Sequence, residues 1–168
     1  MIDHLMPDIP RLYSAIAEWL ACMIFILPFK KRFSKIKTGV IMAVMLVVQS
    51  GFMVVTEDVR LFFWIPCMIV AVFLMLFFIY VSCAIEITDA VYFVLIAFVV
   101  AEFMASIEWQ VACYFRIAQS GVWWKEWSAL ILGYGMISVI LFKILHVHFP
   151  EDGQMEIGWK ECFSAFLI

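Results

Sequence analysis

The sequence KKRFSKIK, residues 30–37, decides how this chain folds and how it inserts. It holds five of the chain's eleven basic residues: Lys30, Lys31, Arg32, Lys35 and Lys37. Apolar runs flank it on both sides, and each is long enough to cross a bilayer. A dense cluster of Lys and Arg between two such runs stays in the cytoplasm, because carrying it across the membrane is costly. The stretch therefore predicts a multi-pass membrane protein with this loop inside the cell.

The composition agrees with a membrane protein. Hydrophobic residues make up 67% of the chain and charged residues only 15%, whereas about a quarter of a soluble protein is charged. No basic stripe indicates nucleic-acid binding, so we expect no nucleic-acid partner. The five cysteines show no metal-ligand spacing, and no catalytic motif is present. We therefore expect no metal, no cofactor and no enzymatic activity within this chain.

The apolar runs predict an all-α polytopic helix bundle in the lipid bilayer, forming a single domain. We expect five full spans and the start of a sixth, with the N-terminus outside: residues 11–29, 38–56, 61–83, 90–110 and 128–148, and a partial span at 162–168. The predicted inner loops carry seven basic residues and the outer segments four, as the positive-inside rule requires. Between the last two full spans, residues 111–127 mix basic and aromatic side chains, which is typical of an interfacial segment.

The last apolar run, from Cys162 to Ile168, is too short to cross a membrane, because a spanning helix needs about twenty residues. It predicts that the chain stops inside a sixth span, as a fragment would. The alternative is a short C-terminal anchor that lies on the inner surface.

Three polar side chains in different predicted spans lie at nearly one depth. Counting from the outer ends, Glu18, Gln49 and Glu102 lie about 10 to 12 Å below the outer surface. An ionisable group inside a span costs about 2.5 kcal/mol or more, so it usually faces protein or a cavity. We expect this layer to line an outward-facing pocket or to couple one to helix movement; the alternative is that each carboxyl bonds locally. Glu108 and Trp109 complete the candidate ligand-binding or coupling residues.

Small residues recur every fourth position in three of the predicted spans. The fourth span carries Ala97, Ala101 and Ala105, the first carries Ala17 and Ala21, and the fifth carries Ala129 and Gly133. Small residues in this register allow another helix to approach closely. They predict close helix contacts through these faces.

Several short stretches together resemble a known family. They are Ala17-Glu18-Trp19-Leu20, Leu27-Pro28-Phe29-Lys30-Lys31-Arg32, VAEFMASIEWQ at residues 100–110, and Asp152-Gly153 ahead of Trp159-Lys160-Glu161. With them, most of the chain resembles the N-terminal membrane sensor region of GHKL-type histidine kinases of Gram-positive bacteria, the group that includes quorum-sensing peptide receptors. The resemblance implies six or seven spans, then, beyond Ile168, a dimerisation helix with the phosphorylated histidine and an ATP-binding domain.

The function implied by this resemblance is signal input for a two-component system in the bacterial plasma membrane. An extracellular ligand, a peptide or a small molecule, would engage the outer surface formed by residues 57–60 and 108–127. A homodimer would form through the cytoplasmic part. Two other readings stay open: a small multi-pass transporter or substrate-binding membrane subunit, in which the buried carboxyls bind substrate or a coupling ion, and a structural scaffold or assembly factor.

Overall fold

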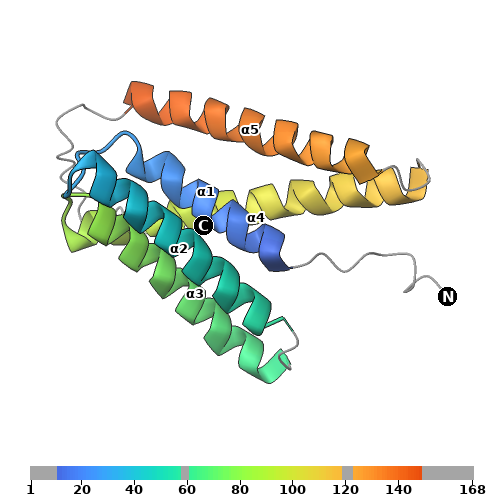
Figure 1. Ribbon diagram of the computed structural model, residues 1–168, viewed down its shortest axis with the longest axis horizontal. Helices are drawn as coiled ribbons and strands as arrows, with labels where there is room; N and C mark the ends of the chain where they lie inside the picture. Colours follow the sequence, from blue (N-terminus) through green and yellow to red (C-terminus); the bar gives the residue numbers. More distant parts are fainter. Residues whose placement is uncertain (1–10, 58–60, 119–122, 149–168) are drawn as a thin grey trace.

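The chain forms a bundle of helices (Figure 1). The computed structural model describes residues 11–57, 61–118 and 123–148. Five helices follow one another: α1 (Arg11–Ile26), α2 (Lys35–Val55), α3 (Leu61–Ser82), α4 (Ile87–Ala118) and α5 (Trp123–His148). The described residues contain no strand beyond one isolated bridge between Lys31 and Cys83. The all-α prediction is confirmed.

Four of the five helices contain segments long and apolar enough to cross a bilayer: Lys35–Val55, Phe62–Ser82, Ile87–Val111 and Trp127–Ile144. This indicates a multi-pass membrane protein. The prediction of five full spans is wrong for the first, because the described part of α1 has 16 residues and is about 24 Å long, against about 30 Å of hydrocarbon. The helix ends at Ile26, two residues before Pro28, rather than at residue 29. The predicted partial span at 162–168 lies outside the described residues.

The short helix α1 lies at the centre of the bundle. It contacts each of the other four helices, whereas, within the described ranges, α2 contacts neither α4 nor α5. Ala15, Ala17, Ala21 and Cys22 are fully buried on it, and their small side chains let neighbouring backbones approach closely. Because the other helices surround α1, this short helix does not by itself have to cross the full thickness of the hydrocarbon.

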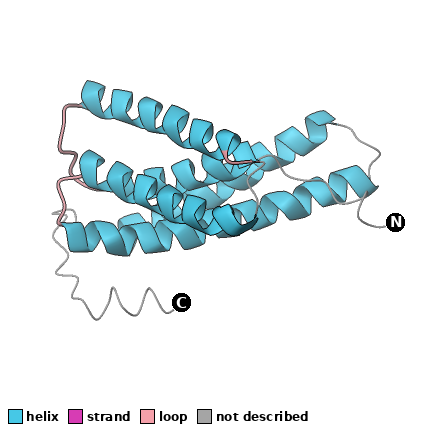
Figure 2. Ribbon diagram, turned by 90° about the horizontal axis from the view of Figure 1, so that it is seen from below, coloured by secondary structure: helices cyan, strands magenta, loops and turns pink. Residues whose placement is uncertain are grey.

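The helices run alternately up and down, so the connections gather at two ends. We call the end that holds residues 27–34 and 83–86 the basic end, and the end that holds Arg11 and residues 55–57 the far end. Figure 2 shows the two basic-end loops together at one end of the bundle. Their backbones pair: Arg32 N–H donates to Ser82 O at 3.1 Å, and Ala84 N–H donates to Lys30 O at 2.9 Å.

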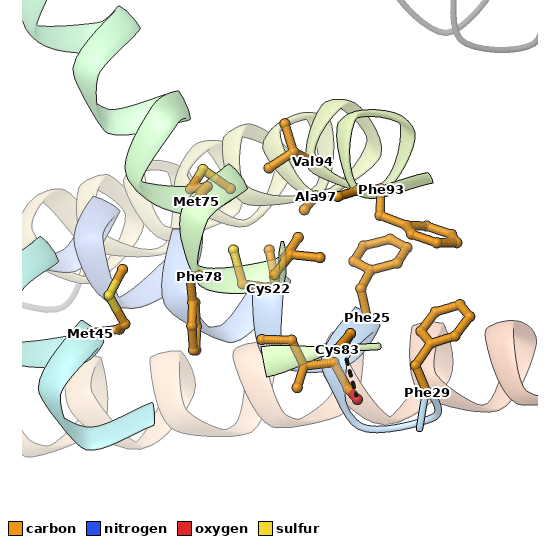
Figure 3. Packing of buried hydrophobic residues seen from close by; sticks show 14 of the residues in the cluster. Cys22, Phe25, Phe29, Met45, Met75, Phe78, Cys83, Phe93, Val94 and Ala97 are labelled. Atoms are coloured by element: carbon orange, nitrogen blue, oxygen red, sulfur yellow. Dashed lines mark hydrogen bonds between the residues drawn. The ribbon is translucent and has the colours of Figure 1, made fainter. Parts of the chain in front are cut away.

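The main hydrophobic core lies between α1, α3 and α4 in the half near the basic end (Figure 3). The ring of Phe93 lies 5.8 Å from that of Phe25 and 4.7 Å from that of Phe29, measured between centroids. Cys83 is fully buried beside them, and its thiol donates to Ile26 O at 3.9 Å. Large side chains from three helices therefore pack closely in this half.

Near the far end the packing divides into two smaller clusters. Ala15 of α1 packs with Met53 of α2 and Ala71 of α3. Ala17 of α1 packs instead with Met104 of α4 and Tyr134 of α5. In Figure 1 the pair α2/α3 diverges from the pair α4/α5 toward this end. In this half, α1 is shared between two helix pairs.

Helices α4 and α5 are longer than predicted. The fourth span was expected to end at residue 110 and the fifth to begin at residue 128, but α4 continues to Ala118 and α5 begins at Trp123. The described residues of the expected interfacial segment are therefore helical. No Gly or Pro occurs between Ile87 and Ala118 to end the helix. At about 48 Å, α4 exceeds the hydrocarbon thickness, so its ends reach the headgroup regions.

Candidate functional site

A buried polar contact joins α1 to α2. Gln49 Nε2 donates to Glu18 Oε2 at 2.5 Å, and the side chains are 0% and 3% exposed, respectively. Glu18 is buried because α1 is covered by its neighbours. The count of residues along the two predicted spans placed these side chains at one depth, and the structure brings them together.

The amide of Gln49 is only half satisfied. Its Oε1 atom is buried and has no hydrogen-bond partner among the described residues. A buried acceptor without a partner costs free energy, so such groups in folded proteins need an explanation. The contact therefore retains one open acceptor next to a carboxyl group, in surroundings that are otherwise apolar.

Glu102, the third member of the expected layer, does not join this contact. Its side chain is exposed on α4. The neighbouring residue Ala101 points into the bundle and is 3% exposed. The structure thus joins two of the three predicted residues and leaves the third on the surface of the described helices.

A second buried polar contact joins α4 to α5. The Tyr134 hydroxyl donates to Glu108 Oε2, and Glu108 is 1% exposed. Trp109, the other candidate on this part of α4, is exposed at its surface. Glu108 was among the residues predicted from the sequence, whereas its partner Tyr134 was not.

The spacing of residues along α4 indicates that Glu108 lies on the buried face of the helix. Counting residues from the outer end of the span gives only the depth of Glu108 and not this direction. Ala97, Ala101, Met104 and Glu108 follow one another at intervals of four, three and four, which places them on one helix face. All four are buried. On α5, Tyr134 likewise follows Leu130 by four positions, and both are buried.

Two further contacts tie the start of α1 to both helix pairs at the far end. Arg11 Nη1 donates to the backbone oxygen of Thr56 at 2.7 Å, at the C-terminus of α2. A cation at this position is favourable, because the carbonyl ends of a helix carry partial negative charge. On the other side, the rings of Tyr13 and Trp127 of α5 lie 5.4 Å apart between centroids.

The basic end carries the five basic residues from which the membrane topology was predicted. Lys30, Arg32, Lys35 and Lys37 are exposed, and Lys31 is partly exposed. Their position at the opposite end from Glu57 agrees with the predicted alternation of loops. In the part of the chain that the structure describes, no group of three or more His, Cys, Asp or Glu side chains could hold a metal ion.

Comparisons with protein-family models, curated proteins and solved structures gave no match for this chain.

Proposed function

We propose that this chain is the membrane-embedded signal-input module of a sensor histidine kinase. Its basic end lies in the cytoplasm of a bacterial cell, and its far end accepts an extracellular peptide or small molecule. The resemblance of the sequence to GHKL-type kinase sensor regions supports the class of protein. The arrangement of α1 supports the mechanism.

The observation that carries the mechanism is the sharing of α1 between two helix pairs. Near the far end, Ala15 packs toward α2 and α3, and Ala17 packs toward α4 and α5. The hydrogen bond between Gln49 and Glu18 holds α1 to α2, and the hydrogen bond between Tyr134 and Glu108 holds α4 to α5. Near the far end the two pairs therefore form two units that share α1, whereas nearer the basic end α3 and α4 also contact each other directly.

A ligand shifts such a bundle only if it binds one packing arrangement better than another. A ligand that contacts α4 and α5 at the far end, beside exposed Trp109 and Trp127, would change how these helices sit against α1. Because α5 runs back to the basic end, its movement would reach the following part of the chain. Signal input then needs no chemistry within the bundle.

The test is a chimera that joins this chain to the cytoplasmic part of a GHKL kinase. We expect its autophosphorylation to respond to a fraction of the culture medium of the source cell, and Tyr134→Phe to change that response. Tyr92→Phe is the matched control, because Tyr92 is a partly buried tyrosine of the same helix near the basic end, and the change keeps its ring contact with Phe93. A chimera that folds and autophosphorylates, yet responds to no extracellular fraction, would contradict the proposal.

One observation favours a transporter instead. The Oε1 atom of Gln49, which has no hydrogen-bond partner among the described residues, and the adjacent Glu18 carboxyl offer oxygen atoms that a coupling ion or a polar substrate could use. Uptake by proteoliposomes, abolished by Glu18→Gln and retained in the Glu102→Gln control, would support this second function. Absence of any uptake, together with a ligand response of the chimera, would decide for signal input.

A further inference from the structure

We propose that the basic end holds one anionic phospholipid. Its headgroup phosphate would contact Lys37, the lysine that lines a shallow groove at the start of α2, with Lys30 and Lys35 in the same basic stretch, and one acyl chain would follow that groove. This inference goes beyond the proposed signal input and concerns the opposite end of the bundle; it shares with that proposal only the cytoplasmic placement of the basic end.

The groove is formed by one continuous stretch of the chain. Its walls are Phe33, Ile36, Lys37, Val40 and Ile41. Apart from Lys37, they are apolar, and Ile36 and Val40 are 82% and 57% exposed, respectively. Ile36 and Val40 are four positions apart, as are Lys37 and Ile41, so the two pairs form adjacent rows along the helix. A hydrocarbon chain would contact both rows.

The order of residues along α2 matches the order of groups in a phospholipid. Lys35 and Lys37 stand in the first turn of the helix, and Val40 and Ile41 follow toward the middle of the predicted span. A lipid in the inner leaflet places its phosphate at the membrane surface and its acyl chain deeper. Lys37 and the deeper apolar walls, Val40 and Ile41, therefore fall at the depths where an inner-leaflet lipid carries its charge and its hydrocarbon, while Phe33 and Ile36 lie at the level of the lysines.

The charges at this end favour an anion. Lys31 Nζ donates to Leu27 O at 2.6 Å, and the Arg32 guanidinium lies 4.7 Å from the centre of the Tyr80 ring. Lys30, Lys35 and Lys37 are exposed in the same stretch. The acidic residues of the neighbouring segment are Glu86, which is exposed, and Asp89, which is buried. Basic clusters beside a membrane span bind anionic lipids for this electrostatic reason.

The basic loop, residues 27–34, is held in place by the loop that follows α3. Its backbone pairs with the loop after α3 through the hydrogen bonds of Arg32 N–H to Ser82 O and Ala84 N–H to Lys30 O. A ligand that binds to a fixed loop pays less ordering entropy than one that must immobilise a free chain. This anchoring distinguishes the site from a lipid-facing surface that carries scattered lysines.

The experiment uses native mass spectrometry of the purified full chain in a neutral detergent. It compares phosphatidylglycerol with phosphatidylcholine of identical acyl chains. We expect phosphatidylglycerol to bind more tightly, and Lys37→Gln to weaken its binding about fivefold, which corresponds to about 1 kcal/mol for one lysine near an anionic lipid. Lys143→Gln is the matched control, because Lys143 is an exposed lysine on α5 outside the groove.

Two further measurements distinguish the binding of a phospholipid from the binding of a free anion. Val40→Ser should weaken phosphatidylglycerol binding, because it replaces an exposed apolar wall of the groove without disturbing the core. Glycerol 3-phosphate, which has the phosphate but no acyl chain, should not displace the lipid at equal concentration. Equal binding of the two phospholipids, equal losses in Lys37→Gln and Lys143→Gln, an unchanged affinity in Val40→Ser, or displacement by glycerol 3-phosphate would each overturn the proposal.

Discussion

At the scale of single residues, the contact of Glu18 with Gln49 has opposing contributions. The hydrogen bond offsets part of the cost of burying a carboxyl group, while Gln49 Oε1 remains without a partner among the described residues. Hydrogen bonds between membrane helices are worth about 0.6 kcal/mol on average, and up to about 1.7 kcal/mol. The contact is therefore a modest stabiliser, and its main effect is to fix the position of α1 against α2.

We predict that Gln49→Leu lowers the free energy of unfolding by about 1 kcal/mol, because it leaves Glu18 buried without this donor. Equilibrium unfolding in mixed detergent micelles would measure the change. Gln110→Leu, at an exposed position on α4, should have little effect. In the double variant Glu18→Leu/Gln49→Leu, the loss of unfolding free energy should differ from the sum of the losses in the two single variants. A loss equal to that sum would show that the residues do not interact.

Cys83 gives a second test at this scale. Burial raises the pKa of its thiol to about 11, although the charges of Lys31 and Arg32 act in the opposite direction. A raised pKa keeps the group protonated at every pH below about 11, and the thiolate is the reactive form. In a background without the other cysteines, we predict slow maleimide labelling of Cys83 at both pH 7 and pH 9.

The control for Cys83 is a cysteine at Ser34, an exposed position in the basic loop, in a chain that lacks the native cysteines. It should react rapidly under the same conditions. Comparable rates at the two positions would mean that Cys83 is not buried between the two basic-end loops.

The sequence allowed the depth of each polar residue to be predicted, but not its direction around the helix axis. The depth of a residue in a span follows from the fixed rise per residue of a helix, and this rule predicted that Glu18 and Gln49 lie at nearly the same level. Direction depends on which face each helix buries. Glu102 follows buried Ala101 by one position, a turn of about 100°, and is exposed. Tyr134 could not be predicted as the partner of Glu108 either, because a partner on another helix depends on how the helices pack.

At the scale of the elements, small residues explain why α1 is central. Ala17 and Ala21 on α1, and Ala97 and Ala101 on α4, are all buried, as the repeated small residues predicted. Ala105, the third alanine of that register on α4, is only partly buried. The buried alanines of that register, Ala97 and Ala101, therefore lie in the main core together with Ala21 of α1.

We predict that Ala97→Leu destabilises the fold by about 1 to 3 kcal/mol, because the larger side chain overfills a closely packed contact. Ala105→Leu makes the same chemical change on the same helix and should cost clearly less. Unfolding free energies in micelles would compare the two. Equal effects would show that α1 does not pack closely against Ala97.

The ends of the elements were harder to predict than their existence. Basic and aromatic residues after Gln110 suggested that the fourth span stops there, yet α4 continues to Ala118. Charged and aromatic side chains at headgroup depth are compatible with a helix, because only the backbone has to stay hydrogen-bonded. The apolar segment of α4 ends at Val111, close to the predicted end of the span, and the helix extends past that point.

At the scale of the whole molecule, the bundle has two unlike halves. Near the basic end, one core of large side chains joins α1, α3 and α4, and the two loops pair through their backbones. Near the far end, two small clusters share α1. The outward faces of α2 and α3 remain apolar and exposed, Val47 and Phe62 among them, as a lipid environment requires. Both the signal-input and the lipid-binding proposals depend on which end faces the cytoplasm.

Labelling of substituted cysteines in intact cells tests this orientation most directly. In a chain without its native cysteines, a cysteine replaces Ser34 at the basic end or Glu57 at the far end, both exposed positions. With a maleimide that does not cross membranes, we predict labelling at position 57 in intact cells and at position 34 only after the cells are opened. Labelling at position 34 in intact cells, with protection at position 57, would contradict the account.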